Sequence, residues 1–310
     1  MTVFDAHCDT VQKITDFGGN IVDNTYHIDV NRLKLYEGYI QVFAAFIDKK
    51  SDVLPPFKRC NQLIDSYFYE IGKVTDRVCH CLNSDGINSA LNKGSLAALL
   101  SIEGGEALEG KIENLNCFYD RGVRAMTLTW NYSNEISGGI GERNSGGLTD
   151  FGRNVVSKMN ELGMIIDVSH ISEQGFWDVV EVSESPIAAT HSNVKKLCPH
   201  PRNLSDEQIC AIIKNGGCIG INLYTEFIGG NKCSIRDVIS HIEHILALGG
   251  ENNIGLGCDF DGMSKLPKGI EGVQDIYKLF DEMQRCGYAD LLINKIASGN
   301  FLNLCEKILL

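Results

Sequence analysis

A histidine and an aspartate stand two residues apart near the start of the chain, as His7 and Asp9 in the run DAHCDT. The apolar residues before them, MTVF, predict a short buried strand. Residues i and i+2 of a strand point to the same face, so we expect His7 and Asp9 to converge while Cys8 points away. Such a pair can bind a metal, act as an acid and base, or form a buried hydrogen bond. Taken alone, so short a motif favours the hydrogen bond.

Further metal-competent side chains end other apolar runs of the chain. They are Glu103 after LAALLSI, His170 after MIIDVS, His191 in PIAATH and Asp259 in NIGLGCDF. The C-terminal ends of parallel barrel strands meet at one rim, where barrel enzymes build their active sites. Six such residues at five strand ends favour a metal site over separate structural roles. They exceed the needs of one zinc ion and suit two metals bridged by a carboxylate and a hydroxide, with Glu103 as the bridge.

The elements that must position these residues alternate between short apolar runs and amphipathic stretches. The runs expected to be strands are 2–6, 39–47, 96–102, 123–130, 164–169, 186–191, 218–224 and 253–260. The helical patterns are 57–78, 112–121, 150–162, 173–182, 206–214 and 235–248, and one of them has a start signal in Ser205 and Gln208. Eight apolar strands separated by helices predict parallel βα units that close into a (β/α)8 TIM barrel, an α/β fold, in a single domain over residues 1–310.

An open doubly wound sheet is the alternative fold. A sheet of that kind is expected to carry a glycine-rich dinucleotide fingerprint directly after a strand. The run IEGGEALEG follows a strand but lacks the required spacing. The barrel is therefore the favoured fold.

Composition excludes several classes of protein. The formal charge of −12 argues against a nucleic-acid partner. No run approaches the ~18 consecutive apolar residues of a membrane span, and the first residues do not resemble a signal peptide. Twelve cysteines scattered through predicted strands and helices indicate reduced thiols without disulfides, in a cytoplasmic protein. Cys79, His80 and Cys81 have no second cysteine or histidine pair at zinc-site spacing, so we interpret them as structural.

The motifs in chain order resemble the renal (membrane) dipeptidase family of binuclear zinc peptidases. The resemblance covers nearly the whole chain and depends on DAHCDT, SIEGGEAL, MIIDVSHIS, ATHSN, PHPRN and GLGCDFDG. It implies a TIM barrel of the metal-dependent hydrolase type. It also implies that two zinc ions are bound, one by His7, Asp9 and Glu103 and the other by Glu103, His170 and His191.

The resemblance assigns two further residues to the reaction. Asp259 matches the family's acid/base carboxylate, which receives a proton from the bridging water and passes it to the leaving amine, so Asp259 and Glu103 are the candidate catalytic residues. Arg202 matches the arginine that pairs with the free C-terminal carboxylate of the substrate. A planar guanidinium grips a carboxylate through two hydrogen bonds, which would restrict the site to very short peptides.

One position departs from the family pattern. Where mammalian members carry a histidine that contacts substrate, the run LTWNYSNE has Trp130. An indole donates one hydrogen bond but cannot titrate. Asn131 or the second zinc ion is a candidate to stabilise the oxyanion instead, and Trp130 is either a substrate-contacting residue or part of the pocket wall.

Several other residues are weaker candidates. Tyr224 at a strand end is expected to be either a pocket residue or a core cap, and His200 is expected to shape the loop that presents Arg202. His241 and His244 lie three apart on a predicted helix and are expected on its solvated face rather than as a metal pair. The glycine-rich run 137–147 is either a lid or a surface excursion.

The function implied is that of a dipeptidase without a membrane anchor, because the terminal run CEKILL lacks the signal for one. It would hydrolyse dipeptides with a free C-terminal carboxylate, tolerate D-residues at the second position, and accept Co²⁺ or Mn²⁺ in place of Zn²⁺. The alternatives are another binuclear amidohydrolase, such as a cyclic amide hydrolase or deaminase, and a catalytically silent metal-binding barrel. No strand ends in a lysine that could bridge the metals of the former class. The sequence leaves open a homodimer.

Overall fold

The computed structural model of the chain describes residues 1–309. Its strands in chain order are β1 (Thr2–Cys8), β2 (Gly38–Phe46), β3 (Val78–His80), β4 (Leu96–Glu103), β5 (Val123–Thr127), β6 (Ile165–Asp167), β7 (Ala188–Ala189), β8 (Cys218–Ile221) and β9 (Ile254–Leu256). All pairings between them are parallel, and β1 pairs with both β2 and β9 while β2 also pairs with β4. The eight strands other than β3 therefore close into the predicted barrel.

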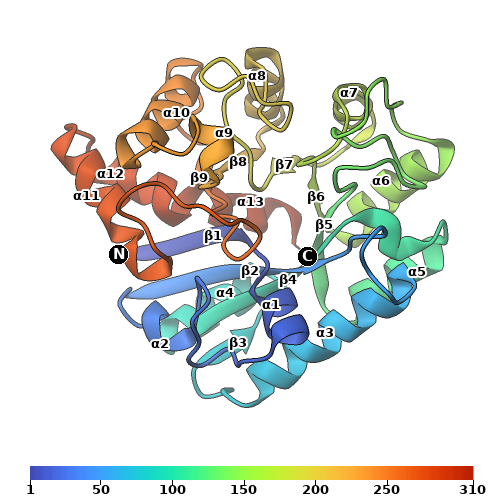
Figure 1. Cartoon of the computed structure of the whole chain (residues 1–310), viewed down its shortest axis with the longest axis horizontal. Helices are drawn as coiled ribbons and strands as arrows, with labels where there is room; N and C mark the ends of the chain where they lie inside the picture. Colours follow the sequence, from blue (N-terminus) through green and yellow to red (C-terminus); the bar gives the residue numbers. More distant parts are fainter. Residues whose placement is uncertain (310) are drawn as a thin grey trace.

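Helices surround this ring of strands, most of them around its outside (Figure 1). They are α1 (Thr10–Phe17), α2 (Val30–Leu33), α3 (Pro56–Gly72), α4 (Ser84–Asn92), α5 (Ile112–Asp120), α6 (Asp150–Leu162), α7 (Glu173–Val182), α8 (Asp206–Asn215), α9 (Thr225–Ile228), α10 (Ile235–Ala247), α11 (Tyr277–Arg285), α12 (Asp290–Asn294) and α13 (Asn300–Ile308). The (β/α)8 fold is thereby confirmed.

The strands are buried on both faces, which is why they read as continuous apolar runs. All eight residues of β4 are buried. Along β1 and β2, alternate residues belong to two different clusters: Phe4 and Val42 face the barrel interior, while Val3 and Phe43 pack toward the surrounding helices. The period of two along each strand separates the two cores.

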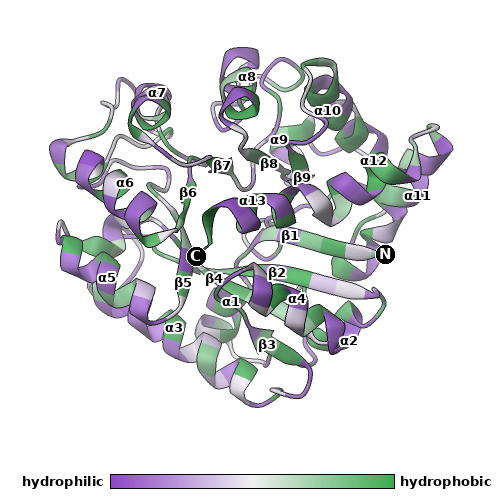
Figure 2. Ribbon diagram, turned by 180° about the vertical axis from the view of Figure 1, so that it is seen from behind, coloured by the Kyte–Doolittle hydropathy of each residue, from purple (hydrophilic) through white to green (hydrophobic). Residues whose placement is uncertain are grey.

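Helix α13 closes the end of the barrel opposite the strand C-termini. Seen from behind, it lies across the centre of the molecule (Figure 2). Its apolar residues Phe301, Leu304 and Ile308 belong to the interior cluster, and the ring of Phe301 stacks on Phe4 with centroids 5.2 Å apart. Gly255 on β9 makes room for this ring, since a Cβ there would lie 2.3 Å from a carbon of Phe301.

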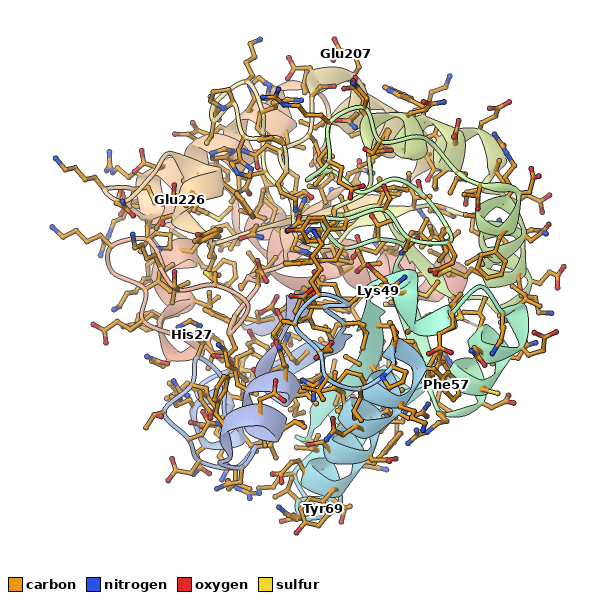
Figure 3. All side chains as sticks on the ribbon, turned by 45° about the vertical axis from the view of Figure 1, so that its right-hand side comes forward. His27, Lys49, Phe57, Tyr69, Glu207 and Glu226 are labelled. Atoms are coloured by element: carbon orange, nitrogen blue, oxygen red, sulfur yellow. The ribbon has the colours of Figure 1, made fainter. Side chains whose placement is uncertain are left out.

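Two helices show how local sequence sets their bounds. Helix α8 begins with the predicted capping box of Ser205 and Gln208 and ends at Gly216 in a left-handed conformation. Helix α3 was expected to continue to residue 78, but it ends at Gly72, and strand β3 begins at Val78. Tyr69 near the end of α3 projects from the outer edge of the molecule (Figure 3).

Two further observations concern the whole chain. Within residues 1–309, no helix combines the length and the apolar character needed to cross a membrane. All twelve cysteines are free thiols, as expected. His80, in the Cys-His-Cys run, accepts a hydrogen bond of 2.8 Å from the hydroxyl of Tyr67 at Nδ1, if the ring carries its proton on Nε2.

Candidate metal centre

Glu103, the last residue of β4, lies at the centre of a cluster of histidines at the barrel rim. Its Oε2 lies 3.1 Å from Nε2 of His7. Its Oε1 lies 3.1 Å from Nε2 of His170 and 3.5 Å from Nε2 of His191. The two oxygens of one carboxylate thus face different histidines, which is the arrangement that a bridging ligand needs.

His7 and Asp9 converge, as the strand pattern predicted. Asp9 Oδ2 lies 3.5 Å from Nε2 of His7, and Cys8 points into the outer core. Asp9 Oδ1 is buried and has no hydrogen-bond partner among residues 1–309, which is unusual for a carboxylate oxygen away from water. Gly262 keeps open the space beside the carboxylates of Asp9 and Asp259, because a Cβ at this position would lie 2.2 Å from Asp9 Oδ2 and 2.5 Å from Asp259 Oδ1.

His170 and His191 approach each other from the ends of β6 and β7, with their Nε2 atoms 2.9 Å apart. On the far side of each ring, Nδ1 has its own partner: Oδ1 of Asn131 at 2.8 Å for His170 and Oγ1 of Thr190 at 2.8 Å for His191. His170 has a positive φ of 66°. Such a strained backbone conformation is costly outside glycine and is concentrated at functional sites.

Burial and charge set the protonation of this cluster. Burial lowers the pKa of His170 to about 3, and Arg202 acts in the same direction. Burial also lowers the pKa of His191. Burial opposes charge on His7 as well, but the carboxylates of Glu103 and Asp9 outweigh it and raise the pKa of His7 well above its usual value. Two imidazoles are therefore neutral and can offer a lone pair.

The carboxylates respond to the same charges. Burial alone would raise the pKa of Glu103, but the charge of His7 outweighs it and holds the pKa well below the usual range. Burial, together with the nearby Glu103, raises the pKa of Asp9 to about 7. The carboxylates of Glu103 and Asp9 thus attract positive charge to the space between them. A divalent cation bound there would take the place of the proton that His7 otherwise carries. The donor set, the unpartnered Asp9 Oδ1 and the space beside Gly262 fit metal ions.

Asp259 follows β9 and is held over the same cluster. Its Oδ2 accepts a hydrogen bond of 2.9 Å from the side-chain amide of Asn222, and its Oδ1 lies 4.0 Å from Nε2 of His7. Like His170, Asp259 has a positive φ, here 60°. Ligand atoms of His7, Asp9 and Asp259 lie within 4.8 Å of one another. A group in this position can act on a metal or on a proton beside it.

Arg202 lies next to the cluster and is only 6% exposed. One terminal nitrogen donates to the carbonyl oxygen of His191 at 3.0 Å and the other to Oγ of Ser192 at 3.4 Å. Its buried Nε has no partner in the part of the chain that the structure describes. Burial lowers the pKa of Arg202 to about 10, which still leaves it charged at neutral pH. The ring of His200 accepts the backbone N–H of Arg202 at 3.2 Å, so His200 does help to fix the loop.

An open cavity of about 580 Å³ adjoins these residues, and its lining includes Asn131, His170, His200, Arg202 and Phe227. Residues 140–143 of the glycine-rich loop also line it. The N–H of Ile140 donates to the carbonyl of His170 at 2.8 Å, which attaches this loop to the metal cluster. The loop is therefore a wall of the cavity rather than a surface excursion.

Trp130 and Tyr224 lie nearby without lining this cavity. Trp130 packs edge-on against Phe46, with centroids 5.0 Å apart, and its ring lies 6.3 Å from that of His170. Tyr224 packs against Phe227 at 4.9 Å. The rings of both residues thus lie close to residues that line the cavity, and their contact with substrate stays a prediction.

Sequence reasoning missed three polar residues that contact the cluster, namely Asp167, Thr190 and Asn222. The only available signal was a polar residue inside or just beyond an apolar strand. The expectation for His241 was wrong: it is buried on α10, where Nδ1 accepts the N–H of Val194 at 3.0 Å and Nε2 lies 3.0 Å from the carbonyl oxygen of Ile228. His244 instead lies 2.7 Å from Asp206.

A closed barrel with histidines and carboxylates gathered at the C-terminal rim of its strands defines a metal-dependent hydrolase. The sequence model described as "Membrane dipeptidase (Peptidase family M19)" matches residues 1–309. The chain belongs to this family and is a metallopeptidase, a dipeptidase by family.

Two proteins of similar sequence extend this result. An uncharacterized dipeptidase of Schizosaccharomyces pombe is 31% identical over 304 residues, covering 91% of this chain and 72% of that protein. An uncharacterized protein from the pqqA 5′ region of Klebsiella pneumoniae is 34% identical over 239 residues, covering 74% of this chain and 88% of that protein.

A solved structure shares the whole fold. The metallo peptidase of Rhodobacter sphaeroides, liganded with a phosphinate mimic of the dipeptide L-Ala-D-Ala, has a TM-score of 0.91 and is 26% identical. The match covers 99% of each chain. The barrel is thus similar to that of a metallopeptidase along its full length.

Proposed function

We propose that the protein is a zinc-dependent dipeptidase that hydrolyses dipeptides with a free C-terminal carboxylate. The observation that carries this proposal is the position of Glu103, whose two oxygens face His7 on one side and His170 and His191 on the other. The cavity that holds Arg202 opens beside them. In this proposal the ligands around Glu103 would hold two cations, and Arg202 would bind the carboxylate of a small substrate.

The residues divide naturally into two sets of metal ligands. His7, Asp9 and Glu103 would hold one Zn²⁺, and Glu103, His170 and His191 the other, with Co²⁺ or Mn²⁺ as substitutes. Two such ions would polarise the scissile carbonyl and lower the pKa of bound water toward neutrality. Each of these ligand residues is buried, so the cations would act in a poorly solvated site.

Asp259 is placed to move a proton. Its Oδ2 is engaged by Asn222, so Oδ1 is the oxygen that faces the metal cluster. In the proposed reaction this carboxylate takes a proton from the attacking water and gives it to the amine that leaves. Asn222 keeps the carboxylate aimed at the cluster through both transfers.

Arg202 orients the other end of the substrate. A guanidinium has five N–H donors, and only two partners are found for Arg202 within the described part of the chain. Its remaining donors can grip a carboxylate, which would favour substrates whose C-terminus lies one residue beyond the scissile bond. Asn131, which binds His170 and lines the same cavity, is the candidate contact for the carbonyl oxygen.

Tolerance for a D-residue at the second position is part of the proposal. The related Rhodobacter sphaeroides enzyme was solved with a mimic of L-Ala-D-Ala. The cavity beside Arg202, of about 580 Å³, has room for a side chain of either configuration. We therefore expect both L-Ala-L-Ala and L-Ala-D-Ala to be cleaved.

One experiment tests the function as a whole. Metal content of the purified protein is measured by elemental analysis, alongside hydrolysis of L-Ala-L-Ala, L-Ala-D-Ala, tri-alanine, C-terminally amidated Ala-Ala and dihydrouracil. We expect close to two metal ions per chain and turnover of the two free dipeptides, abolished by a chelator. Cleavage of dihydrouracil alone would indicate a cyclic amide hydrolase, and a metal-loaded protein without turnover would indicate a silent binding barrel.

A further inference from the structure

Asp167, the last residue of β6, is a buried carboxylate that the proposed reaction does not use. It is 2% exposed and lies beneath the histidine cluster, with Oδ2 4.0 Å from Nδ1 of His191. A charged group so deep in the barrel is costly unless its oxygens are all hydrogen-bonded. The pattern of those hydrogen bonds shows what Asp167 does.

Each oxygen of Asp167 accepts two hydrogen bonds. Oδ1 accepts the backbone N–H groups of Ser169 at 2.9 Å and Thr190 at 3.0 Å. Oδ2 accepts the hydroxyls of Thr127 at 2.6 Å and Thr190 at 2.5 Å. A carboxylate offers about four lone-pair positions, so all are occupied. Although Asp167, His7 and His191 lie close enough together to hold a cation, Asp167 has no lone pair left for one.

Thr190 connects this carboxylate to a metal-ligand histidine. Its Oγ1 lies 2.5 Å from Asp167 Oδ2 and 2.8 Å from Nδ1 of His191. A hydroxyl has one hydrogen to donate, and an ionised carboxylate can only accept. The hydrogen of the Thr190 hydroxyl therefore points to Asp167. Toward His191 the hydroxyl oxygen can only accept, so Nδ1 of His191 must carry the hydrogen.

We propose that Asp167 and Thr190 act as positioning residues that hold His191 in the Nδ1–H tautomer, so that its Nε2 lone pair is directed at the metal site. The inference rests on the proposed metal centre. Asp167 would then act without binding a metal itself. A hydrogen-bond partner on the second ring nitrogen of a ligand histidine fixes the ring and raises its affinity for metal. Nε2 of His191 is oriented toward Glu103 and His170, in agreement with this direction.

The chain offers a matched control for the test. Thr127 also donates its hydroxyl to Oδ2 of Asp167, yet the structure records no hydrogen bond from it to a histidine. Thr190→Val and Thr127→Val each remove one hydrogen bond from the same buried oxygen and leave a side chain of similar shape. Only Thr190→Val removes the partner of His191 Nδ1. Thr190→Ser restores the hydroxyl.

The measurement is Zn²⁺ affinity of the purified full-length chain by competition with a chromogenic chelator. We expect Thr190→Val to weaken one of two bound zinc ions by about 10–100-fold, the range for losing such a partner. Thr127→Val should stay within about threefold of the native protein, and Thr190→Ser should recover native affinity. Equal losses in both valine variants, or native affinity in Thr190→Val, would overturn the inference.

A second readout does not depend on any variant folding. In the metal-free native protein with ¹⁵N-labelled histidine, the shifts of His191 should show hydrogen on Nδ1 and a bare Nε2. Hydrogen on Nε2 would overturn the inference. A native protein that binds no zinc in the competition assay would instead remove the proposed metal centre, so the two failures are distinguishable.

Discussion

The side-chain amide of Asn222 donates a hydrogen bond of 2.9 Å to Oδ2 of Asp259, and this leaves Oδ1 as the oxygen that faces the histidine cluster. The backbone of Asp259 is unusual as well, with a positive φ of 60°. Aspartate and asparagine tolerate this conformation better than most residues. The position is therefore suited to a conservative substitution.

Asp259→Asn should lower kcat by about 10²-fold or more, the scale for losing a positioned acid/base group. Asparagine tolerates the positive φ of this position as well as aspartate does. Its side-chain oxygen can still accept the hydrogen bond from Asn222. We expect metal content to stay near the native value, because the proposal places Asp259 beside the water rather than on a cation. Elemental analysis with steady-state kinetics checks both points, and loss of a metal ion would make Asp259 a ligand.

Glu103→Gln should abolish activity and release at least one metal ion. The substitution keeps the shape of the side chain but replaces one oxygen with a donor nitrogen, so only one side of the cluster retains an acceptor. Metal content and turnover of a free dipeptide are the measurements. Glu113→Gln, on the exposed face of α5, is the matched control. Near-native turnover with a full metal complement would show that Glu103 does not bridge.

Glu106 should make stability depend on pH. It is buried beside Asn134, and burial raises its pKa from 4.5 to about 7. Between these values the folded chain keeps a proton that the unfolded chain has released, so the free energy of unfolding falls as pH rises and stays lower above pH 7. Glu106→Gln is neutral throughout and should gain about 1–3 kcal/mol over the native protein between pH 4.5 and pH 8.

Urea unfolding in the presence of a chelator measures this difference without a contribution from bound metal. Glu113→Gln is again the control, and its stability should follow that of the native chain at every pH. A stability difference between Glu106→Gln and the native protein that does not change with pH would contradict the assignment.

The residues gathered at the barrel rim could be foreseen because each one ends an apolar run. His7, Glu103 and His191 come from β1, β4 and the end of β7, which are far apart in the chain, and closure of the ring brings them within a few ångströms. Only the fold class was needed to place them together. The roles assigned to them stay predictions.

The partners of these residues could not be foreseen in the same way. Thr190 and Asn222 act through single hydrogen bonds, and no spacing in the sequence distinguishes them from other polar residues near strand ends. The length of β7 was also overestimated, since this strand has two residues where 186–191 was expected.

The position of α13 in the fold could not be predicted from the spacing of apolar residues either. No helix was predicted over residues 300–308, although Phe301, Leu304, Cys305 and Ile308 have the spacing of an apolar helix face. That spacing does not say which surface the face covers, and in the structure it fills the end of the barrel. His241 shows the same limit, since only its contacts with the backbone of Val194 and Ile228 distinguish it from a solvated histidine.

Arg202 should make the enzyme a dipeptidase rather than a general peptidase. Amidating the C-terminus of the substrate removes the charge that Arg202 is proposed to grip, and should cost about 2–5 kcal/mol of transition-state stabilisation. Arg202→Ala should cause a similar loss with the free dipeptide. It should cause little further loss with the amidated one, because the two changes remove the same contact.

The four values of kcat/KM, from two enzymes and two substrates, form a double-mutant cycle. Arg202 also donates to the carbonyl of His191 and to Ser192, so part of any loss in the alanine variant arises from a disturbed loop. The cycle subtracts that part, since it affects both substrates alike. Losses that simply add would place the substrate carboxylate away from Arg202, and equal turnover of tri-alanine and Ala-Ala would remove the reason for restricting the site to dipeptides.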